Sequence, residues 1–204
     1  MKLVLATKNE GKVREMTKLL AEQDIEVLSL ADFPEIEEIV EDGETFRENA
    51  VIKATEVCMQ TGLTTLADDS GLEVDYLEGL PGVYSARFAG EEKDDSANNK
   101  KLLELLDGVP EEQRTARFKC VIAVADIDCF VYIAEGTCTG IIAQEQRGDG
   151  GFGYDPLFYL PEHGKTFAEI DLETKNKISH RARALAGVLD ILSDLKKMME
   201  EDEE

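Results

Sequence analysis

The stretch Ala67-Asp68-Asp69-Ser70-Gly71 carries two adjacent carboxylates between two apolar segments. Strand-like residues 63–66 precede it, and strand-like residues 72–74 follow it. Adjacent acids repel each other and are costly to bury, so a site that tolerates them usually supplies a divalent cation or needs a proton acceptor. Strand ends are also where α/β folds place their ligand sites. The same residues are typical of a polar hairpin turn, and the fragment alone leaves both interpretations open.

Apolar and turn patterns alternate along the rest of the chain and predict an α/β fold with a mixed sheet. Strands are expected at residues 3–6, 25–30, 115–125 and 129–138, in addition to the two segments around the acidic pair. Helices are expected at residues 13–20, 45–62, 96–106 and 179–199. A βαβ start followed by a central hairpin predicts two lobes with a cleft between them.

Local signals define the ends of the second predicted helix. Thr45 and Glu48 fit a capping box, in which each side chain satisfies a backbone N–H of the first turn. Gly62 is a natural stop. Lys53 lies on the same helix face as Asn49 and could point to solvent or to the cleft.

Composition limits the possible partners. The 204 residues are 43% hydrophobic, which suits one domain with a proper core, and no apolar run approaches the roughly 20 residues of a membrane span. The formal net charge of -22 argues against nucleic-acid polymers and anionic membranes, but it allows a small anionic ligand in a locally cationic pocket. Four cysteines without a Cys-x-x-Cys pair predict buried thiols in a cytoplasmic protein.

Residues 7–12, Thr-Lys-Asn-Glu-Gly-Lys, join the first strand to the first helix. Backbone amides at a helix N-terminus, together with two lysines, a hydroxyl and an amide, can hold phosphate oxygens. Thr7 or Asn9 could equally serve only as a helix cap. The chain has no Walker A pattern.

Residues 148–153 match G-x-G-x-x-G, but the aromatic, proline-containing residues 154–159 follow instead of a helix. The dinucleotide-binding interpretation therefore fails. We expect a loop that lets the backbone approach a ligand, with Phe152 and Tyr154 stacking on a flat ring and Asp155 accepting hydrogen bonds. The alternative is that these aromatic residues only pack in the core.

Two further polar groups complete the candidates. Residues 175–181, Lys-Asn-Lys-Ile-Ser-His-Arg, gather donors before the last helix, although such clusters are often solvated. Glu41 lies outside the second helix and could reach a metal ion.

Several of these segments match one family in order and spacing. The chain resembles the inosine triphosphate pyrophosphatases over nearly its whole length. The matching motifs are Thr7-x-Asn9-x-x-Lys12, Thr45-Phe46-x-Glu48-Asn49-Ala50, the segment 67–72, Pro81 to Arg87, Gly151-Phe152-Gly153-Tyr154-Asp155-Pro156 and Ser179-His180-Arg181. The acidic tail at about 200–204 and Asp94-Asp95 have no place in the pattern.

The resemblance implies one two-lobed pyrophosphatase domain over residues 1–204, an elongated mixed sheet flanked by helices, a homodimer and a Mg²⁺ cofactor. It implies that Glu41 and Asp69 bind the metal, that Asp68 assists, and that Asp69 accepts a proton from water. The implied substrate-binding residues are Thr7, Lys8, Asn9, Glu10, Gly11, Lys12, Lys53, Ser70, Phe152, Gly153, Tyr154, Asp155, Lys175, His180 and Arg181. Of these, Arg181 is expected to recognise O6 of a purine, because a guanidinium only donates hydrogen bonds.

The implied reaction is attack of water on the α-phosphorus of ITP, dITP or XTP, which gives the monophosphate and pyrophosphate. A purine nucleotide sensor without turnover is the alternative of a different class. The pair Asp68-Asp69 together with Glu41 favours the enzyme.

Overall fold

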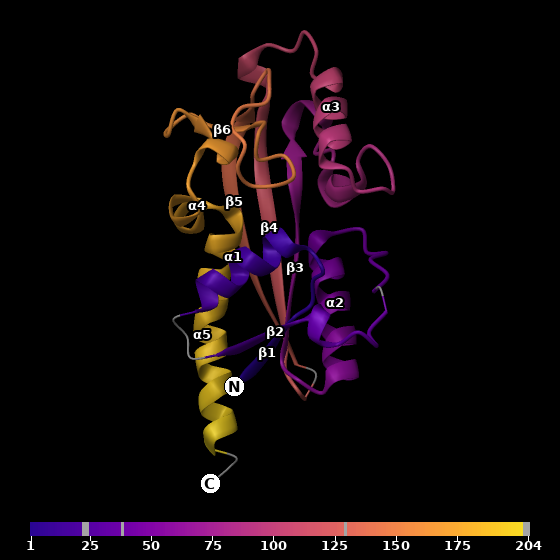
Figure 1. Cartoon of the computed structure of the whole chain (residues 1–204), viewed down its shortest axis with the longest axis vertical. Coiled ribbons are helices and arrows are strands. Elements are labelled where there is room, and N and C mark those ends of the chain that lie inside the picture. The colour runs from indigo at the N-terminus through magenta and orange to yellow at the C-terminus, as the bar shows by residue number, and fades with distance from the viewer. Residues whose placement is uncertain (22–24, 38, 129, 202–204) are drawn as a thin grey trace. The chain divides into compact units, whose positions relative to one another are not determined.

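The structure is a computed structural model that describes residues 1–21, 25–37, 39–128 and 130–201. Within these residues seven strands form one sheet in the order β2-β1-β3-β4-β5-β6-β7 (Figure 1). Strand β1 (Lys2–Leu5) pairs in parallel with β2 (Glu26–Ser29) and β3 (Thr65–Val74), whereas β6 (Phe158–Leu160) pairs antiparallel with both of its neighbours. The mixed sheet predicted from the sequence is confirmed.

The remaining elements complete this α/β chain. The other strands are β4 (Thr115–Ala125), β5 (Val131–Ile142) and β7 (Lys165–Thr166). The helices are α1 (Glu10–Leu20), α2 (Phe46–Thr61), α3 (Asp95–Leu105), α4 (Leu172–Ile178) and α5 (His180–Glu201). No helix among the described residues is both long and apolar enough to cross a membrane.

The chain divides into two compact units. Unit 1 comprises Met1–Asp69, Cys120–Gly136 and Arg181–Glu204, and unit 2 comprises Ser70–Lys119 and Thr137–His180. The division passes through β3 between Asp69 and Ser70, so the two halves of the Asp-Asp-Ser-Gly motif belong to different units.

Unit 1 has a core to which α1 and α5 contribute together. Side chains of β1, β3 and β4 pack there against Met16 and Leu20 of α1 and against Leu185 and Val188 of α5. Among the described residues, none from α2 joins this core, and Figure 1 shows α2 across β1 and β3 from α1 and α5. The strands of unit 1 are therefore covered by helices on both faces.

Helix α2 begins and ends where the sequence predicts. Both hydrogen bonds of the capping box between Thr45 and Glu48 are present, and Gly62 ends the helix in the left-handed conformation at φ +66°. These local signals are reliable because they satisfy backbone groups that the helix itself leaves unpaired.

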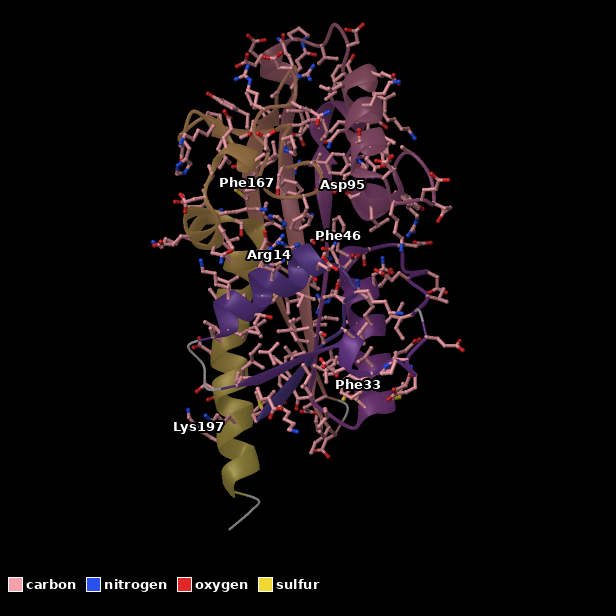
Figure 2. All side chains as sticks on the ribbon, in the orientation of Figure 1. Arg14, Phe33, Phe46, Asp95, Phe167 and Lys197 are labelled. Carbon is pink, nitrogen blue, oxygen red and sulfur yellow. The ribbon has the colours of Figure 1, made fainter. Side chains whose placement is uncertain are left out.

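Unit 2 has a core rich in aromatic residues. The ring of Phe118 lies 4.6 Å from that of Phe158 and 5.9 Å from that of Phe167, centroid to centroid. Helix α3 buries Leu102 in this core and carries Asp95 in its first turn. Figure 2 labels Asp95 and the core residue Phe167. Asp94 caps α3 by accepting hydrogen bonds from two backbone amides.

The hairpin-turn alternative for residues 68–71 is wrong, and so is the expectation of two strands around them. The segments 63–66 and 72–74 belong with the acidic motif to one region, in which Thr65–Val74 is a single strand. Aspartate is disfavoured in strand interiors, which is why the pattern resembles a break. The strand continues because side chains distant in sequence satisfy the two carboxylates.

Other differences are smaller. Helix α4 and the short strands β6 and β7 were not expected, and Gly82–Arg87 forms a 3-10 helix. Cys58, Cys120 and Cys138 are buried, as predicted. Cys129 and the end of the acidic tail, residues 202–204, lie outside the described residues.

Candidate active site

The predicted catalytic and metal-binding residues lie together in unit 1, in a set of charged side chains that we call the charged cluster. It consists of Lys12, Glu15, Glu41, Lys53, Asp68, Asp69 and Arg181. Asp68 and Asp69 are consecutive strand residues, so their side chains point to opposite faces of the sheet. One carboxylate therefore meets α1 and α5, and the other meets α2.

Asp68 lies on the face of α1 and α5 and is 2% exposed. Its Oδ2 is 2.9 Å from Nζ of Lys12 and 3.4 Å from Nε of Arg181. Arg181 also pairs with Glu15, a buried residue of α1. Burial acts to raise the pKa of Asp68, but Lys12 and Arg181 outweigh it and hold that pKa well below its ordinary value.

Asp69 lies on the face of α2. Its Oδ2 accepts a hydrogen bond from Nδ2 of Asn49 at 3.2 Å, and its Oδ1 is 3.6 Å from Nζ of Lys53. Burial raises the pKa of Asp69 above its ordinary value, and the nearby lysines do not compensate for it fully. Asp69 therefore holds a proton more readily than its neighbour Asp68 does.

Lys53 connects α2 to the acidic loop before it. Its Nζ donates to Oε2 of Glu41 at 2.7 Å and to the backbone oxygen of Asp68 at 2.9 Å. Burial acts against its charged form, but Asp69 and Glu41 outweigh this effect, and the pKa of Lys53 is raised. Of the two orientations left open by the sequence, solvent or interior, the structure places the ammonium group in the charged cluster.

Asn49 positions the same loop from its other side. Its Oδ1 accepts a hydrogen bond from the backbone amide of Gly43 at 2.8 Å, while its Nδ2 donates to Asp69. A Cβ at Gly43 would lie 2.7 Å from that Oδ1, so only glycine permits this approach. Helix α2 thus fixes both Asp69 and the segment that carries Glu41.

The two adjacent carboxylates have different environments, and this difference suits different roles. A pair of titratable groups with pKa values pushed in opposite directions can divide acid–base work between them. Asp68 is held ionised by its cations, whereas Asp69 is the group that can take up a proton.

The donor set of the charged cluster fits a hard divalent cation. Carboxylate oxygens are the ligands that Mg²⁺ prefers. Glu41 and Asp69 both approach the ammonium group of Lys53, so a positive charge already lies where these carboxylates converge. Among the described residues no three acidic, histidine or cysteine side chains are gathered tightly enough to hold a metal by themselves. A metal held here would need further oxygen ligands from water or substrate, which is usual for Mg²⁺.

The predicted phosphate-binding segment, residues 7–12, forms the start of α1. Asn9 is the helix cap, because its Oδ1 accepts from the backbone amide of Lys12 at 3.0 Å. Thr7 accepts from the amide of Asn9 at 3.2 Å, and Lys8, Asn9 and Glu10 are exposed. The capping interpretation holds for Asn9, and the exposed turn still presents the positive end of the helix dipole.

Four predicted base-binding residues, Phe152 to Asp155, belong to unit 2 and lie in residues 148–155, which we call the glycine loop. Asp155 is 3% exposed, and its Oδ2 accepts from Nζ of Lys175 at 2.6 Å and from the amide of Phe152 at 2.8 Å. The same ammonium group lies 4.9 Å from the centre of the half-buried Phe152 ring. Asp155 accepts these hydrogen bonds from within the protein, and its predicted role toward a base stays a prediction, while a cation–π contact orients Phe152.

The prediction for Tyr154 needs correction. Tyr154 is 4% exposed, lies in the core of unit 2 and donates its hydroxyl to the backbone oxygen of Ser85 at 2.8 Å, so it does not present its ring to a ligand. The alternative of core packing is right for Tyr154. His180 is also buried, and its ring stacks on Phe118 with the centroids 4.7 Å apart.

Three of the remaining predicted positions are placed as follows. Arg181 belongs to unit 1 and is 2% exposed in the charged cluster. Lys175 belongs to helix α4, which was not expected from the sequence. Ser70 is half-buried in β3.

Sequence reasoning missed two residues of the charged cluster and its surroundings. Glu15 follows the phosphate-binding segment on α1, but it resembles any acidic residue of a surface helix. Asn49 was used only as a spacing marker for Lys53. A polar residue inside the motif Glu48-Asn49-Ala50, on the buried side of a helix, was the signal that could have identified it.

Known proteins match this chain over most of its length. The Ham1 family profile matches residues 3–191. A dITP/XTP pyrophosphatase from Desulforamulus reducens is 58% identical over 96% of this chain and 97% of its own, and one from Geobacter sulfurreducens is 53% identical over 94% and 96%.

Solved structures show the same fold. The Ham1 protein of Staphylococcus aureus superposes with a TM-score of 0.85 at 39% identity, covering 95% of this chain and 99% of that one. A HAM1 protein from Coxiella burnetii gives a TM-score of 0.86 at 43% identity with the same coverage.

Proposed function

Because this chain belongs to the Ham1 family, we propose that it hydrolyses non-standard purine nucleoside triphosphates. The substrates are ITP, dITP and XTP, and the products are the monophosphate and pyrophosphate. The observation that carries this proposal is the 58% identity, over nearly the whole of both chains, to a protein named dITP/XTP pyrophosphatase. Such an activity removes non-standard nucleotides from the pool.

The charged cluster supports a role in phosphoryl transfer. The triphosphate would lie at the first turn of α1, where backbone amides and Lys12 are available, and Lys53 would neutralise further charge. Thr7, Lys8, Asn9, Glu10 and Gly11 complete this proposed segment. The strongly acidic chain as a whole repels a polyanion, so this local group of cations is what permits binding.

Asp69 is the proposed catalytic residue. It accepts a proton from water as the water oxygen forms a bond to the α-phosphorus. The bond from that phosphorus to the bridging oxygen breaks, and pyrophosphate leaves with the electron pair. The raised pKa of Asp69 fits a group that must hold a proton transiently. Asn49 and Lys53 fix the carboxylate in its orientation.

Mg²⁺ is the proposed cofactor, held by Glu41 and Asp69 with assistance from Asp68. When bound, it would polarise the phosphate and lower the pKa of a bound water. Lys53 orders Glu41 and Asp69 toward a shared positive charge.

The base is proposed to bind at the glycine loop of unit 2. Phe152 supplies a ring for stacking, Gly153 supplies backbone, and Asp155 and Lys175 supply polar groups. Ser70, Tyr154 and His180 contribute through their neighbours and by shaping this part of the chain. Arg181 remains the predicted reader of purine O6, a role in competition with its pairing to Asp68 and Glu15.

We also propose that residues 1–204 act as one domain, as a homodimer, in the cytoplasm. The match of the Ham1 profile over residues 3–191 supports a single functional domain. The dimer rests on the family resemblance, and light scattering coupled to gel filtration tests it. A monomer mass at micromolar concentration would contradict it.

The decisive experiment is a nucleotide panel assayed for pyrophosphate with added Mg²⁺. We expect ITP, dITP and XTP to be hydrolysed far faster than ATP. The matched control is Asp69→Asn, which keeps the size of the side chain and removes its charge. Binding of ITP without any release of pyrophosphate by the wild-type protein would instead support a purine nucleotide sensor.

A further inference from the structure

Helix α3 holds the backbone of one residue of the glycine loop through two hydrogen bonds. Oδ2 of Asp95 accepts a hydrogen bond from the backbone amide of Gly153 at 2.7 Å. Nδ2 of Asn99 donates to the backbone oxygen of the same residue at 2.9 Å. Asp95 and Asn99 are four residues apart and so lie on one face of the helix. An acceptor and a donor one turn apart therefore match the two polar groups of a single residue in the loop.

Among the described residues, the side chain of Asn99 makes a single hydrogen bond, the one to Gly153. It is 3% exposed, and its Oδ1 has no hydrogen-bond partner there. Burying an amide without partners is costly, so a buried asparagine needs a reason to be present. The hydrogen bond from Nδ2 of Asn99 to the backbone oxygen of Gly153 explains why an asparagine is buried at this position.

Gly153 is suited to being held in this way. Its φ is +61°, in the left-handed region where glycine is favoured. A loop of glycines loses much conformational entropy when it is ordered, so fixed hydrogen bonds are needed to keep it in one conformation.

The other side of the loop is fixed independently. Asp155 accepts from the amide of Phe152 and from Lys175. A Cβ at Gly151 would lie 2.0 Å from Oδ2 of Asp155, so the backbone there approaches the carboxylate as closely as glycine allows. Phe152 is thus fixed in two ways: its own amide donates to Asp155, and the residue that follows it, Gly153, is bound to α3.

We propose that Asp95 and Asn99 are positioning residues for nucleobase recognition, and that they act through the backbone N–H and C=O of Gly153. They hold the glycine loop in the conformation that presents Phe152. This inference rests on the proposed base-binding role of the glycine loop. It gives a function to Asp95, which the family pattern leaves unexplained, and it separates Asp95 from Asp94, which only caps the helix.

The mechanism is preorganisation. A loop that is already ordered does not have to lose conformational entropy when the base binds. Removing either anchor therefore raises KM for ITP and weakens binding of the product IMP. It leaves kcat little changed, because the proton acceptor Asp69 and the cations of the charged cluster are untouched.

The test compares two adjacent asparagines and two adjacent aspartates. Asn99→Ala and Asp95→Ala remove the anchors. Asn98→Ala is the control for loss of a buried amide, since Asn98 bonds instead to the backbone of Ala86 and Ala89. Asp94→Ala is the control for weakening of α3, since Asp94 caps it. KM, kcat, the IMP dissociation constant and the melting temperature are measured for each.

We expect Asn99→Ala and Asp95→Ala to raise KM for ITP and the dissociation constant of IMP by about 3- to 10-fold, the range for one hydrogen bond. Asp95→Asn should stay near the wild type, because an amide oxygen can still accept from Gly153. The two controls should alter the melting temperature more than KM.

Equal increases in KM for the Asn98→Ala or Asp94→Ala controls would overturn the proposal, because α3 would then act only as a structural support. Unchanged KM and IMP binding in both anchor variants would also overturn it. The IMP measurement does not depend on turnover. A wild-type protein that binds IMP but does not hydrolyse ITP would therefore contradict the proposed function and leave the positioning proposal open to the same comparison.

Discussion

The guanidinium of Arg181 pairs with the carboxylate of Asp68 in the interior of unit 1, where Nε and Nη2 lie 3.4 Å and 3.5 Å from Oδ2. A third nitrogen of Arg181 donates to Glu15. Both partners help to raise the pKa of Arg181 against the effect of burial. Arg181, which is expected to read the purine base, is thus also an electrostatic partner of the acidic motif. The two roles predict different effects of replacing it.

Arg181→Ala should destabilise the fold by about 3–5 kcal/mol, the usual cost of removing one partner from a buried ion pair. The carboxylates of Asp68 and Glu15 would lose their shared cation and remain buried. Urea unfolding in chelator measures this loss. Arg181→Lys keeps the charge but not the forked geometry, so it should recover only part of the stability.

The same variant tests base recognition. If Arg181 bonds to O6 of hypoxanthine, Arg181→Ala lowers kcat/KM for ITP more than for ATP, because adenine offers a donor at that position. The wild type should then prefer ITP and XTP over ATP, with GTP poor. An equal loss on ITP and ATP would assign Arg181 to Asp68 and Glu15 alone.

Asp69→Asn should reduce turnover by roughly 10²-fold or more, as expected when a general base is removed. Its effect on stability should be small, because burial already favours the neutral form of Asp69. Asp68→Asn should instead lower the stability of the fold, because Lys12 and Arg181 favour the charged form of Asp68.

Pyrophosphate release and urea unfolding in chelator, measured on both variants, separate these roles. Near-normal turnover of Asp69→Asn would show that Asp69 is not the catalytic carboxylate. Asp68 would then become the candidate.

Local signals predicted the ends of elements well, because they depend on neighbouring residues. The capping box at Thr45 and the stop at Gly62 are examples. The strand through Asp68 and Asp69 was not predicted as one strand, because its stability depends on Lys12, Lys53 and other cations from separate helices. No sequence window around the acidic pair contains them.

The candidate site was predicted in its chemistry and less well in its geometry. Lys175 and Asp155 were both named, but their 2.6 Å pairing was not foreseen. Tyr154 looked like a stacking residue because the sequence shows an aromatic ring in a glycine-rich segment. Whether such a ring packs inward depends on what lies behind it, which here is the backbone of Ser85.

Chelation should abolish turnover of ITP, and added Mg²⁺ should restore it. The expectation follows from the oxygen donors Glu41, Asp68 and Asp69, which suit a hard cation. Zn²⁺ should substitute poorly, because it prefers nitrogen and sulfur ligands in protein sites. Full activity in excess chelator would contradict the cofactor assignment.

Phe152→Ala should weaken binding of IMP by about 1–3 kcal/mol, the range for stacking of a base on an aromatic ring. Phe152 is half-buried, and the nearby ammonium group of Lys175 orients its ring.

Tyr154→Phe is the matched control. It removes only the hydroxyl that donates to Ser85, so it should lower the melting temperature without a comparable loss of binding. Calorimetric titration with IMP and thermal melting of both variants distinguish a stacking residue from a core residue. If Phe152→Ala melts earlier but binds IMP as the wild type does, its ring serves packing, and the polar groups of the loop alone must recognise the base.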